Sequence, residues 1–386
     1  MNPCDLNLLA RAEVRELASY NAGLSSDAVR KRFGLNRIAK LGSNENPLGP
    51  APAVAVAMAK ACSEIALYPD ASCQELRDAL ARKLGVPGEH LVFGNGSEDL
   101  LSIISRVFLD HDDEVVTVVP SFGLHFIYPL ATGAHVVGVP MTASGAFDVA
   151  AMIAAITPRT RLLMFSCPSN PVGCTLNADE LQQLLDVLPA HCLLVFDEAY
   201  YEYAQHEIDY PDCLGLIQAS SKPFVLLRTF SKAYSLAGLR IGYGIVSDPT
   251  LADLIDRLRT PFNVNRVAQA AAVAALADDA HLQATLEHVA GERQRMASEL
   301  RVLGVDCVPS MANFLFFKTA YNAETVNQSL LRQGVILKPW REPGYTDYLR
   351  VSVGSHQDND LFLAALANSL ASLAEHSLDD QQTRSA

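Results

Sequence analysis

The chain has 386 residues, of which 49% are hydrophobic, and a formal net charge of −13. A chain of this length is expected to form about two or three domains with a substantial buried core. The acidic balance, with a pI near 5.2, argues against nucleic acid or an anionic membrane as the main partner.

The N-terminal region is mixed and charged, and Pro3 and Gly23 interrupt any long helix. Residues 1–45 are therefore predicted to form an arm. This region lacks the apolar core of a signal peptide, and no run reaches about 18 apolar residues, so we expect a soluble, cytoplasmic protein. The 8 cysteines show no CxxC pair and no histidine at zinc-ligand spacing, which predicts reduced thiols and no metal site.

Residues 46–265 show the pattern of a large α/β domain. A helix is predicted over residues 74–84, because Gly85 and Pro87 follow as stop signals. Apolar residues at helical spacing predict further helices over 100–108 and 178–188. Short apolar runs typical of buried strands occur at residues 91–93, 114–119, 162–165, 193–196 and 224–227.

These predicted strands end in glycines, polar residues or an aromatic residue. In an open α/β sheet, ligands bind outside the carboxyl ends of the strands. The sequence therefore predicts a binding site at these ends. Its candidate residues are Gly96, Ser97, Phe122, Asn170, Asp197, Tyr200, Thr229, Ser231 and Lys232.

Lys232 follows the last of these strands, close in sequence to Arg240. The hydroxyls of Thr229 and Ser231 and the Arg240 guanidinium are suited to hold a phosphate. The Lys232 amine beside them is suited to bind an aldehyde covalently, which is how pyridoxal phosphate is held. The alternative is a lysine on an exposed loop, since most lysines are solvated surface charges.

The other strand ends offer the remaining parts that pyridoxal phosphate requires. Asp197 is suited to pair with the ring nitrogen, and Asn170 and Tyr200 to hydrogen-bond the ring hydroxyl. Phe122 either stacks on the ring or packs in the core, and Asp197 either pairs with a cation or caps the next helix. The turn at residues 94–97 is either a plain turn or a helix N-terminus that binds the phosphate.

Beyond residue 265 the pattern changes to a smaller α/β domain, residues 266–374. Helices are predicted in it over 267–276, 281–303, 324–331 and 359–373, and a helix over 251–259 precedes the boundary. Strands are predicted over 305–307, 314–317, 335–337 and 349–353. The polar residues 375–386 are predicted to be a disordered tail.

Several motifs together resemble one family, the fold type I pyridoxal-phosphate aminotransferases, and within it the histidinol-phosphate aminotransferase branch. The resemblance covers nearly the whole chain. The matching motifs are SNENPLG (residues 43–49), YPD (68–70), GNGS (94–97), SNPVG (169–173), DEAY (197–200), RTFSKAYSLAGLRIGY (228–243), PFNVN (261–265) and LRVSVG (349–354).

The resemblance implies a large domain with a seven-stranded, mostly parallel sheet, a smaller C-terminal domain, and a homodimer with active sites at the subunit interface. It implies that Tyr68 reaches the cofactor phosphate of the neighbouring subunit. It also implies that Arg350 binds the anionic group of the substrate, with Tyr20 and Asn46 among the substrate residues.

Two positions depart from the pattern of the family. The residue that stacks on the ring is usually tyrosine and is Phe122 here, which keeps the ring and drops a hydroxyl. Twelve residues before Arg350 the family commonly has an arginine, and this chain has Lys338, a point charge without the bidentate fork. Nearby, Arg341 is a candidate to compensate, and Trp340 either lines the pocket or packs.

The resemblance implies transfer of an amino group from L-histidinol phosphate to 2-oxoglutarate, with both as small-molecule partners. The alternatives are an aromatic amino-acid aminotransferase and a threonine-phosphate decarboxylase, which share the same cofactor residues. A ligand-sensing domain of a transcriptional regulator is disfavoured, because the motifs leave no segment for a DNA-binding module and the chain is acidic.

Overall fold

The structure is a computed structural model that describes residues 6–384 of the chain. Its contacts divide the chain into two compact units. The first comprises residues 1–21, 49–170 and 174–282, and the second comprises residues 22–48, 171–173 and 283–386. Each unit is described by itself below.

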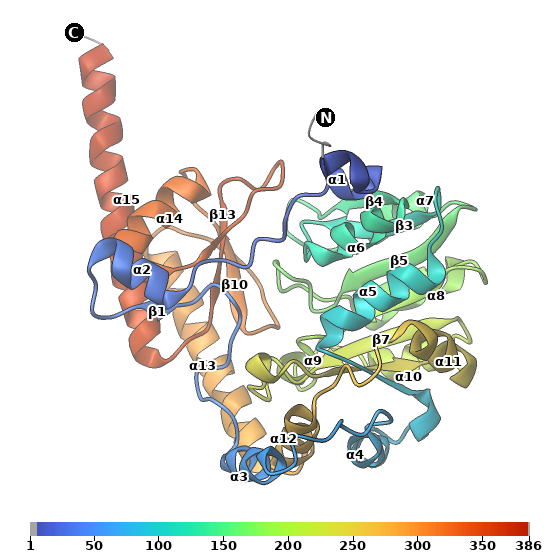
Figure 1. Ribbon diagram of the computed structural model, residues 1–386. Helices are drawn as coiled ribbons and strands as arrows, with labels where there is room; N and C mark the ends of the chain where they lie inside the picture. The colour runs from blue at the N-terminus through green and yellow to red at the C-terminus, as the bar shows by residue number, and fades with distance from the viewer. Residues whose placement is uncertain (1–5, 385–386) are drawn as a thin grey trace, which may run out of the picture. The chain divides into compact units, whose positions relative to one another are not determined.

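The first unit is built on a sheet of seven strands in the order β2-β8-β7-β6-β5-β3-β4 (Figure 1). β8 is antiparallel to both of its neighbours, and all other pairs are parallel, so six strands share one direction. The seven-stranded, mostly parallel sheet predicted from the resemblance is confirmed. In sheet order, the strands are Leu91–Gly94, Gly242–Val246, Phe224–Thr229, Leu193–Asp197, Thr160–Ser166, Glu114–Val119 and His135–Pro140.

Helices cover the sheet of the first unit. The longer helices are α3 (Pro52–Cys62), α4 (Gln74–Leu84), α5 (Ser97–Phe108), α6 (Leu124–Thr132), α8 (Ala178–Val187), α11 (Pro249–Leu258) and α12 (Arg266–Leu276). The shorter ones are η1 (Leu6–Leu9), α1 (Ala12–Arg15), η2 (Gly88–His90), α7 (Val149–Ala155), α9 (Tyr201–Ala204), α10 (Cys213–Ala219) and η3 (Ala237–Leu239).

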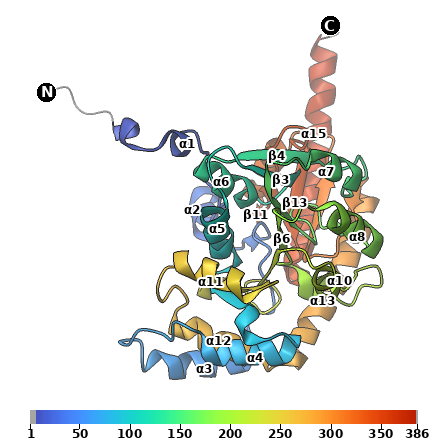
Figure 2. The same ribbon diagram turned by 90° about the vertical axis from the view of Figure 1, so that its right-hand side faces the viewer.

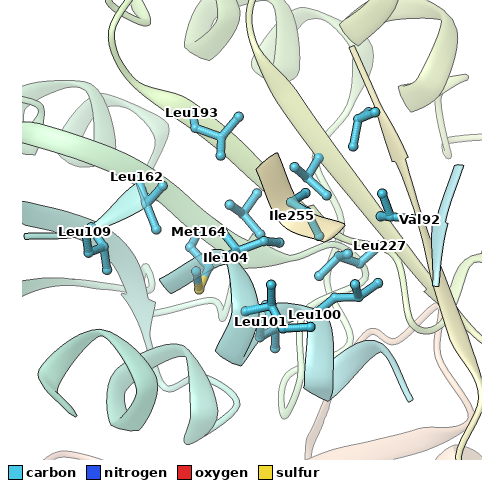
Figure 3. Packing of buried hydrophobic residues seen from close by; sticks show 14 of the residues in the cluster. Val92, Leu100, Leu101, Ile104, Leu109, Leu162, Met164, Leu193, Leu227 and Ile255 are labelled. Atoms are coloured by element: carbon cyan, nitrogen blue, oxygen red, sulfur yellow. The ribbon is translucent and has the colours of Figure 1, made fainter. Parts of the chain in front are cut away.

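The main core of this unit forms where α5 packs on the sheet. Figure 3 shows Leu100, Leu101 and Ile104 of α5 directed at side chains of the central strands, such as Met164 and Leu227. These residues are buried, and a fully buried aliphatic side chain contributes roughly 1.5–3 kcal/mol. The apolar stripe of α5 thereby fixes the N-terminus of the helix against the carboxyl end of β2.

Three helices of the first unit form a layer of their own. α12 packs along α3 and α4, as both views show (Figures 1 and 2). This packing explains why the contact boundary falls at Leu282, whereas the sequence places the start of the small domain at residue 266. The Ala-rich faces of α3 and α12 allow their backbones to approach closely.

The second unit contains a sheet in the order β12-β13-β10-β9 and a parallel pair, β1-β11. Its strands are β1 (Ala39–Lys40), β9 (Cys307–Val308), β10 (Phe314–Lys318), β11 (Val335–Ile336), β12 (Lys338–Pro339) and β13 (Tyr348–Ser352). Its helices are α2 (Ser26–Phe33), α14 (Ala323–Arg332) and α15 (His356–Arg384), and α13 (Asp279–Val302) begins just before the unit boundary.

The segment predicted to be an arm, residues 1–45, is divided between the units. Residues 22–48 belong to the second unit, because β1 pairs with β11 and the Ser352 amide donates to the Leu41 carbonyl over 2.7 Å. The predicted disordered tail also differs from the structure, since α15 continues to Arg384 and the last two residues lie outside the described range. No helix among the described residues is long and apolar enough to cross a membrane.

Candidate active site

Six parallel strands of the first unit end at one edge of its sheet, and most of the predicted site residues follow those ends. β2 and β7 flank β8, so the turn at residues 94–97, the loop after Thr229 and the residue Arg240 before β8 are neighbours. β6, β5 and β3 continue the row and carry Asp197, Asn170 and Phe122. The sheet topology therefore gathers groups that the sequence spreads over more than a hundred residues.

Gly96 and Arg240 form the closest part of this arrangement. Gly96 has a φ of 85°, and a Cβ there would lie 2.6 Å from Arg240 Nη2. A Cβ on Gly242 would lie 2.2 Å from the Ser97 amide nitrogen, so both positions require glycine. The result is a small cradle formed by the N-terminus of α5 and a guanidinium, which suits a phosphate.

Arg240 is held in place by its own contacts. It has a φ of 59°, in the left-handed region, and its Nη1 donates to the Ala237 carbonyl over 3.2 Å. Its Nη2 donates to Glu98 Oε2 over 3.2 Å, and Glu98 Oε1 accepts from the Tyr128 hydroxyl over 3.0 Å. Glu98 therefore orients the guanidinium toward the helix N-terminus.

The loop after β7 presents Lys232. Thr229 Oγ1 accepts from the Ser231 amide over 3.1 Å, and the Lys232 carbonyl accepts from the Ser235 amide over 3.0 Å, which makes a tight turn. Lys232 Nζ lies 5.7 Å from the centre of the Tyr200 ring. Lys232 is half-buried. It is therefore not a solvated lysine on an exposed loop, which was the alternative interpretation of the sequence.

Asp197 ends β6 and is 4% exposed. Its Oδ1 accepts from the Ala199 amide over 3.0 Å in a local turn, and it does not cap the next helix, since the N-cap of α9 is Tyr200. Its Oδ2 lies 3.5 Å from Nε2 of His125, which is fully buried. One carboxylate oxygen is therefore held by the backbone, and the other lies close to a buried imidazole.

His125 was not found from the sequence. Its Nδ1 lies 3.0 Å from Ser121 Oγ, on the side away from Asp197. The only signal in the sequence is a polar residue in the otherwise apolar α6, and such a histidine is usually explained by core packing.

The remaining ring residues lie at the neighbouring strand ends. Asn170 is buried, and its backbone N–H donates to Ser166 Oγ over 2.9 Å. Phe122 is half-buried and makes edge-to-face contacts with Tyr20, at 6.0 Å between ring centres, and with His125, at 5.7 Å. Phe122 thus keeps part of its ring outside the core, as stacking on a ligand requires.

Tyr68 does not join this group in the single chain. Its side chain is 79% exposed, and its ring stacks on Phe262 with 4.6 Å between centres. Val56, Ile65 and Leu67 are also largely exposed nearby in the sequence. Tyr68 therefore belongs to a segment of the first unit that exposes several large apolar side chains.

In the second unit, Lys338 and Arg350 are register partners on the antiparallel strands β12 and β13. Partners of this kind place their side chains on the same face, and two like charges there repel each other. Burial lowers the pKa of Lys338, and together with the charges of Arg350 and Arg341 it brings this pKa to about 8. A half-buried and a buried cation on one face make a favourable place for an anion.

Arg350 is buried and anchored from several sides. Its Nη2 donates to the Gly42 carbonyl over 2.7 Å, and its guanidinium carbon lies 5.3 Å from the centre of the Phe314 ring. Asn46, the other predicted substrate residue of this unit, donates to Thr285 Oγ1 over 3.3 Å and accepts from the Leu48 amide.

Trp340 and Arg341 follow Lys338 but contact other partners. Trp340 packs edge-to-face on Phe316 and donates its ring N–H to Glu342. Of its two predicted roles, these contacts agree with packing. Arg341 is exposed and its Nη2 lies 3.3 Å from Glu324.

Residues 36–366 match the family model "Aminotransferase class I and II". The chain therefore belongs to this aminotransferase family.

Particular relatives carry a more specific name. Histidinol-phosphate aminotransferase 1 of Mesorhizobium japonicum is 48% identical over 94% of this chain and 98% of its own length. Histidinol-phosphate aminotransferase 3 of Rhizobium meliloti is 46% identical over 92% of this chain and 96% of its own length.

A solved structure agrees with these relatives. The histidinol-phosphate aminotransferase of Sinorhizobium meliloti, in complex with pyridoxal-5'-phosphate, superposes with a TM-score of 0.86 at 30% identity and covers 94% of this chain and 98% of that one. The fold of this chain is thus that of the fold type I aminotransferases.

Proposed function

We propose that this protein is a pyridoxal-phosphate-dependent aminotransferase that moves an amino group from L-histidinol phosphate to 2-oxoglutarate. The product pair would be imidazole acetol phosphate and glutamate, in histidine biosynthesis. The observation that carries the proposal is the convergence of an amine, a carboxylate and an anion cradle at the edge of one sheet. The relatives named histidinol-phosphate aminotransferase support it.

The residues at the edge fit the cofactor. Gly96, Ser97, Thr229, Ser231 and Arg240 would hold the phosphate, because glycine at positions 96 and 242 lets the guanidinium and β8 approach the N-terminus of α5 closely. Phe122 would stack on the ring, and Asn170 and Tyr200 would hydrogen-bond its hydroxyl. When bound, the cofactor supplies an electron sink for the bonds at the substrate carbon.

Two residues of this chain would act on protons. Lys232 would attach the cofactor and then, as a free amine, carry a proton to and from the substrate carbon. Asp197 would hold a proton at the ring nitrogen by its negative charge, and the Ala199 amide, which donates to Oδ1, would keep the carboxylate in place.

The phosphate of the substrate would be bound by Lys338 and Arg350. A dianion neutralises both cations of the cross-strand pair, whereas a single carboxylate can be saturated by the two nitrogens of one guanidinium. Tyr20 and Asn46 would contact the rest of the substrate. This charge pairing favours a phosphorylated substrate over an aromatic amino acid.

The test is a half-reaction of the purified enzyme with histidinol phosphate, phenylalanine and threonine phosphate, followed by absorbance and product identification. We expect histidinol phosphate to react fastest and to give the keto product. Arg350→Ala should cost more kcat/KM than Lys338→Ala, by about tenfold, because only the guanidinium binds two phosphate oxygens at once. If phenylalanine reacts faster and Lys338→Ala leaves kcat/KM unchanged, the enzyme is an aromatic aminotransferase. Release of CO₂ from threonine phosphate would favour a decarboxylase.

Lys338 should also give the enzyme a pH dependence. Its pKa of about 8 means that the charge is present below that pH and is lost as the pH rises through it. KM for histidinol phosphate should therefore rise above pH 8, whereas KM for phenylalanine should not. Lys338→Arg should remove this alkaline rise, since the guanidinium stays protonated. Identical alkaline profiles for both enzymes would exclude Lys338 as a phosphate ligand.

We also propose a homodimer in which Tyr68 serves the site of the partner subunit. The exposed apolar side chains of Val56, Ile65, Leu67 and Tyr68 support a second copy as the occupant of this surface, because burying them stabilises association. A cytoplasmic location is supported by the free thiols of all seven described cysteines.

The shared site predicts complementation. A Tyr68→Ala protein and a Lys232→Ala protein should each be nearly inactive, and mixing them should restore part of the activity. One hybrid site then carries both wild-type residues. Val187→Ala, at an exposed apolar position on α8, is the control that should leave activity unchanged. If labelled subunits exchange and activity still does not return, Tyr68 serves its own subunit.

A further inference from the structure

A second cluster of polar side chains is buried at the ends of β5, β6 and β7. It contains Glu198, which is 0% exposed, Arg228, which is 2% exposed, and Tyr210, which is 9% exposed. Asp197 and Leu227 are register partners and share a face of the sheet, whereas Arg228 projects from the opposite face because side chains alternate along a strand. The cluster therefore lies on the other face from the proposed cofactor residue Asp197.

Glu198 binds both other residues of this cluster, Arg228 and Tyr210. Arg228 Nε and Nη2 lie 2.8 Å and 2.7 Å from Glu198 Oε2. The Tyr210 hydroxyl donates to Glu198 Oε1 over 2.8 Å, and the Tyr201 ring lies under the guanidinium, 3.3 Å from its carbon. Although burial opposes the charge, the Glu198 carboxylate holds the pKa of Arg228 above its usual value.

The cluster joins three strand ends. The Tyr210 hydroxyl also lies 3.2 Å from the Cys167 carbonyl at the end of β5, three residues before Asn170. Glu198 follows Asp197 directly, and its amide donates to the Leu227 carbonyl of β7 over 2.8 Å. Arg228 immediately precedes Thr229 on the strand that leads to Lys232.

A buried ion pair is a weak way to stabilise a fold, because desolvation of the two charges offsets most of their attraction. What the hydrogen bonds among Arg228, Glu198 and Tyr210 do supply is one defined geometry. We propose that Arg228, Glu198 and Tyr210 are positioning residues, which hold the ends of β5, β6 and β7 so that Asn170, Asp197 and Lys232 meet the cofactor together. This inference rests on the proposed function of those three residues.

The choice of variant follows from a second acid in the cluster. Glu202 is buried, its Oε2 has no hydrogen-bond partner among the described residues, and burial raises its pKa to about 7. If Glu198 were removed, Glu202 could take its place beside Arg228. Tyr210→Phe is the cleaner change, because it removes the link between β5 and β6 and leaves the ion pair in place.

The experiment compares holoenzymes of wild type and Tyr210→Phe, with Tyr201→Phe as the matched control. Tyr201 meets Arg228 through its ring, which phenylalanine keeps. For Tyr210→Phe we expect kcat to fall about 10- to 100-fold with KM within about threefold. The substrate should still bind, but the residues around the cofactor should no longer be aligned for reaction. The pH midpoint of the absorbance of the bound cofactor should shift by at least about 0.5 unit, because Asp197 and Asn170 move relative to it.

Arg228→Lys is the second variant, and it should shift the same midpoint because lysine lacks the fixed donor geometry of the guanidinium. If the folded variants lower only the melting temperature and keep the wild-type midpoint and kcat, the network is merely structural and the inference is wrong. A wild-type enzyme that neither binds pyridoxal phosphate nor transaminates would instead overturn the proposed function. The two failures are therefore distinguishable.

Discussion

Lys232→Ala should lower kcat by at least about 10⁴-fold, because one change removes both the amine that attaches the cofactor and the base that moves the proton. Lys232 lies in a tight turn after β7, so the truncation removes no core side chain. The variant should fold with a melting temperature close to that of wild type. Activity should be measured with histidinol phosphate and saturating 2-oxoglutarate.

Borohydride reduction identifies the attachment point directly. The reduced wild-type enzyme should carry the cofactor on the peptide that contains Lys232, and Lys232→Ala should carry none. Lys222→Ala is the matched control, because Lys222 Nζ donates to the Leu188 carbonyl over 2.6 Å at the opposite end of β7. That control should keep wild-type turnover and labelling. A stable adduct on any lysine other than Lys232 would exclude the assignment.

The central strands and the main helices were predictable from local sequence. The helix predicted over residues 74–84 has the predicted bounds, because Gly85 adopts the left-handed conformation that ends it. The buried strands β3, β5, β6 and β7 were found because parallel strands covered on both faces are apolar throughout. The number of strands and their mostly parallel arrangement came only from the resemblance to a family, and their order in the sheet comes from the structure.

Two strands of the large sheet were not predicted. β4 (His135–Pro140) is an edge strand with mostly exposed or half-buried residues, so it lacks the apolar run of a central strand. β8 (Gly242–Val246) follows directly on the Lys232 motif, and its two glycines weaken the pattern of a strand. Packing explains those glycines, since a Cβ on Gly242 would strike the Ser97 amide.

The candidate site was partly predictable for a similar reason. Residues such as Asp197 and Lys232 interrupt apolar runs at strand ends, where topology brings ligand groups together. His125 and Tyr210 lie on other elements, and only the three-dimensional structure shows their distances to Asp197 and Glu198. Long-range contacts of this kind leave no local pattern in a single sequence.

Replacing Asp197 should separate its two possible roles. The structure gives Asp197 a local turn, in which Oδ1 accepts from the Ala199 amide, and a buried contact with His125 through Oδ2. Asparagine can accept the same amide hydrogen bond but carries no charge. Asp197→Asn therefore keeps the turn and removes the charge, whereas Asp197→Ala removes both.

If the charge holds the proton on the ring nitrogen, both variants should lose kcat by about 10²- to 10³-fold, which corresponds to roughly 2.7–4 kcal/mol of barrier. If Asp197 only caps the turn, Asp197→Asn should stay within about tenfold of wild type and only Asp197→Ala should suffer. Asp212→Ala is the control, since Asp212 caps α10 by accepting from the Gly215 amide and should affect stability alone. The absorbance of the bound cofactor should show whether each variant still binds it, because a loss of kcat in a fully loaded Asp197→Asn enzyme isolates the effect of the charge.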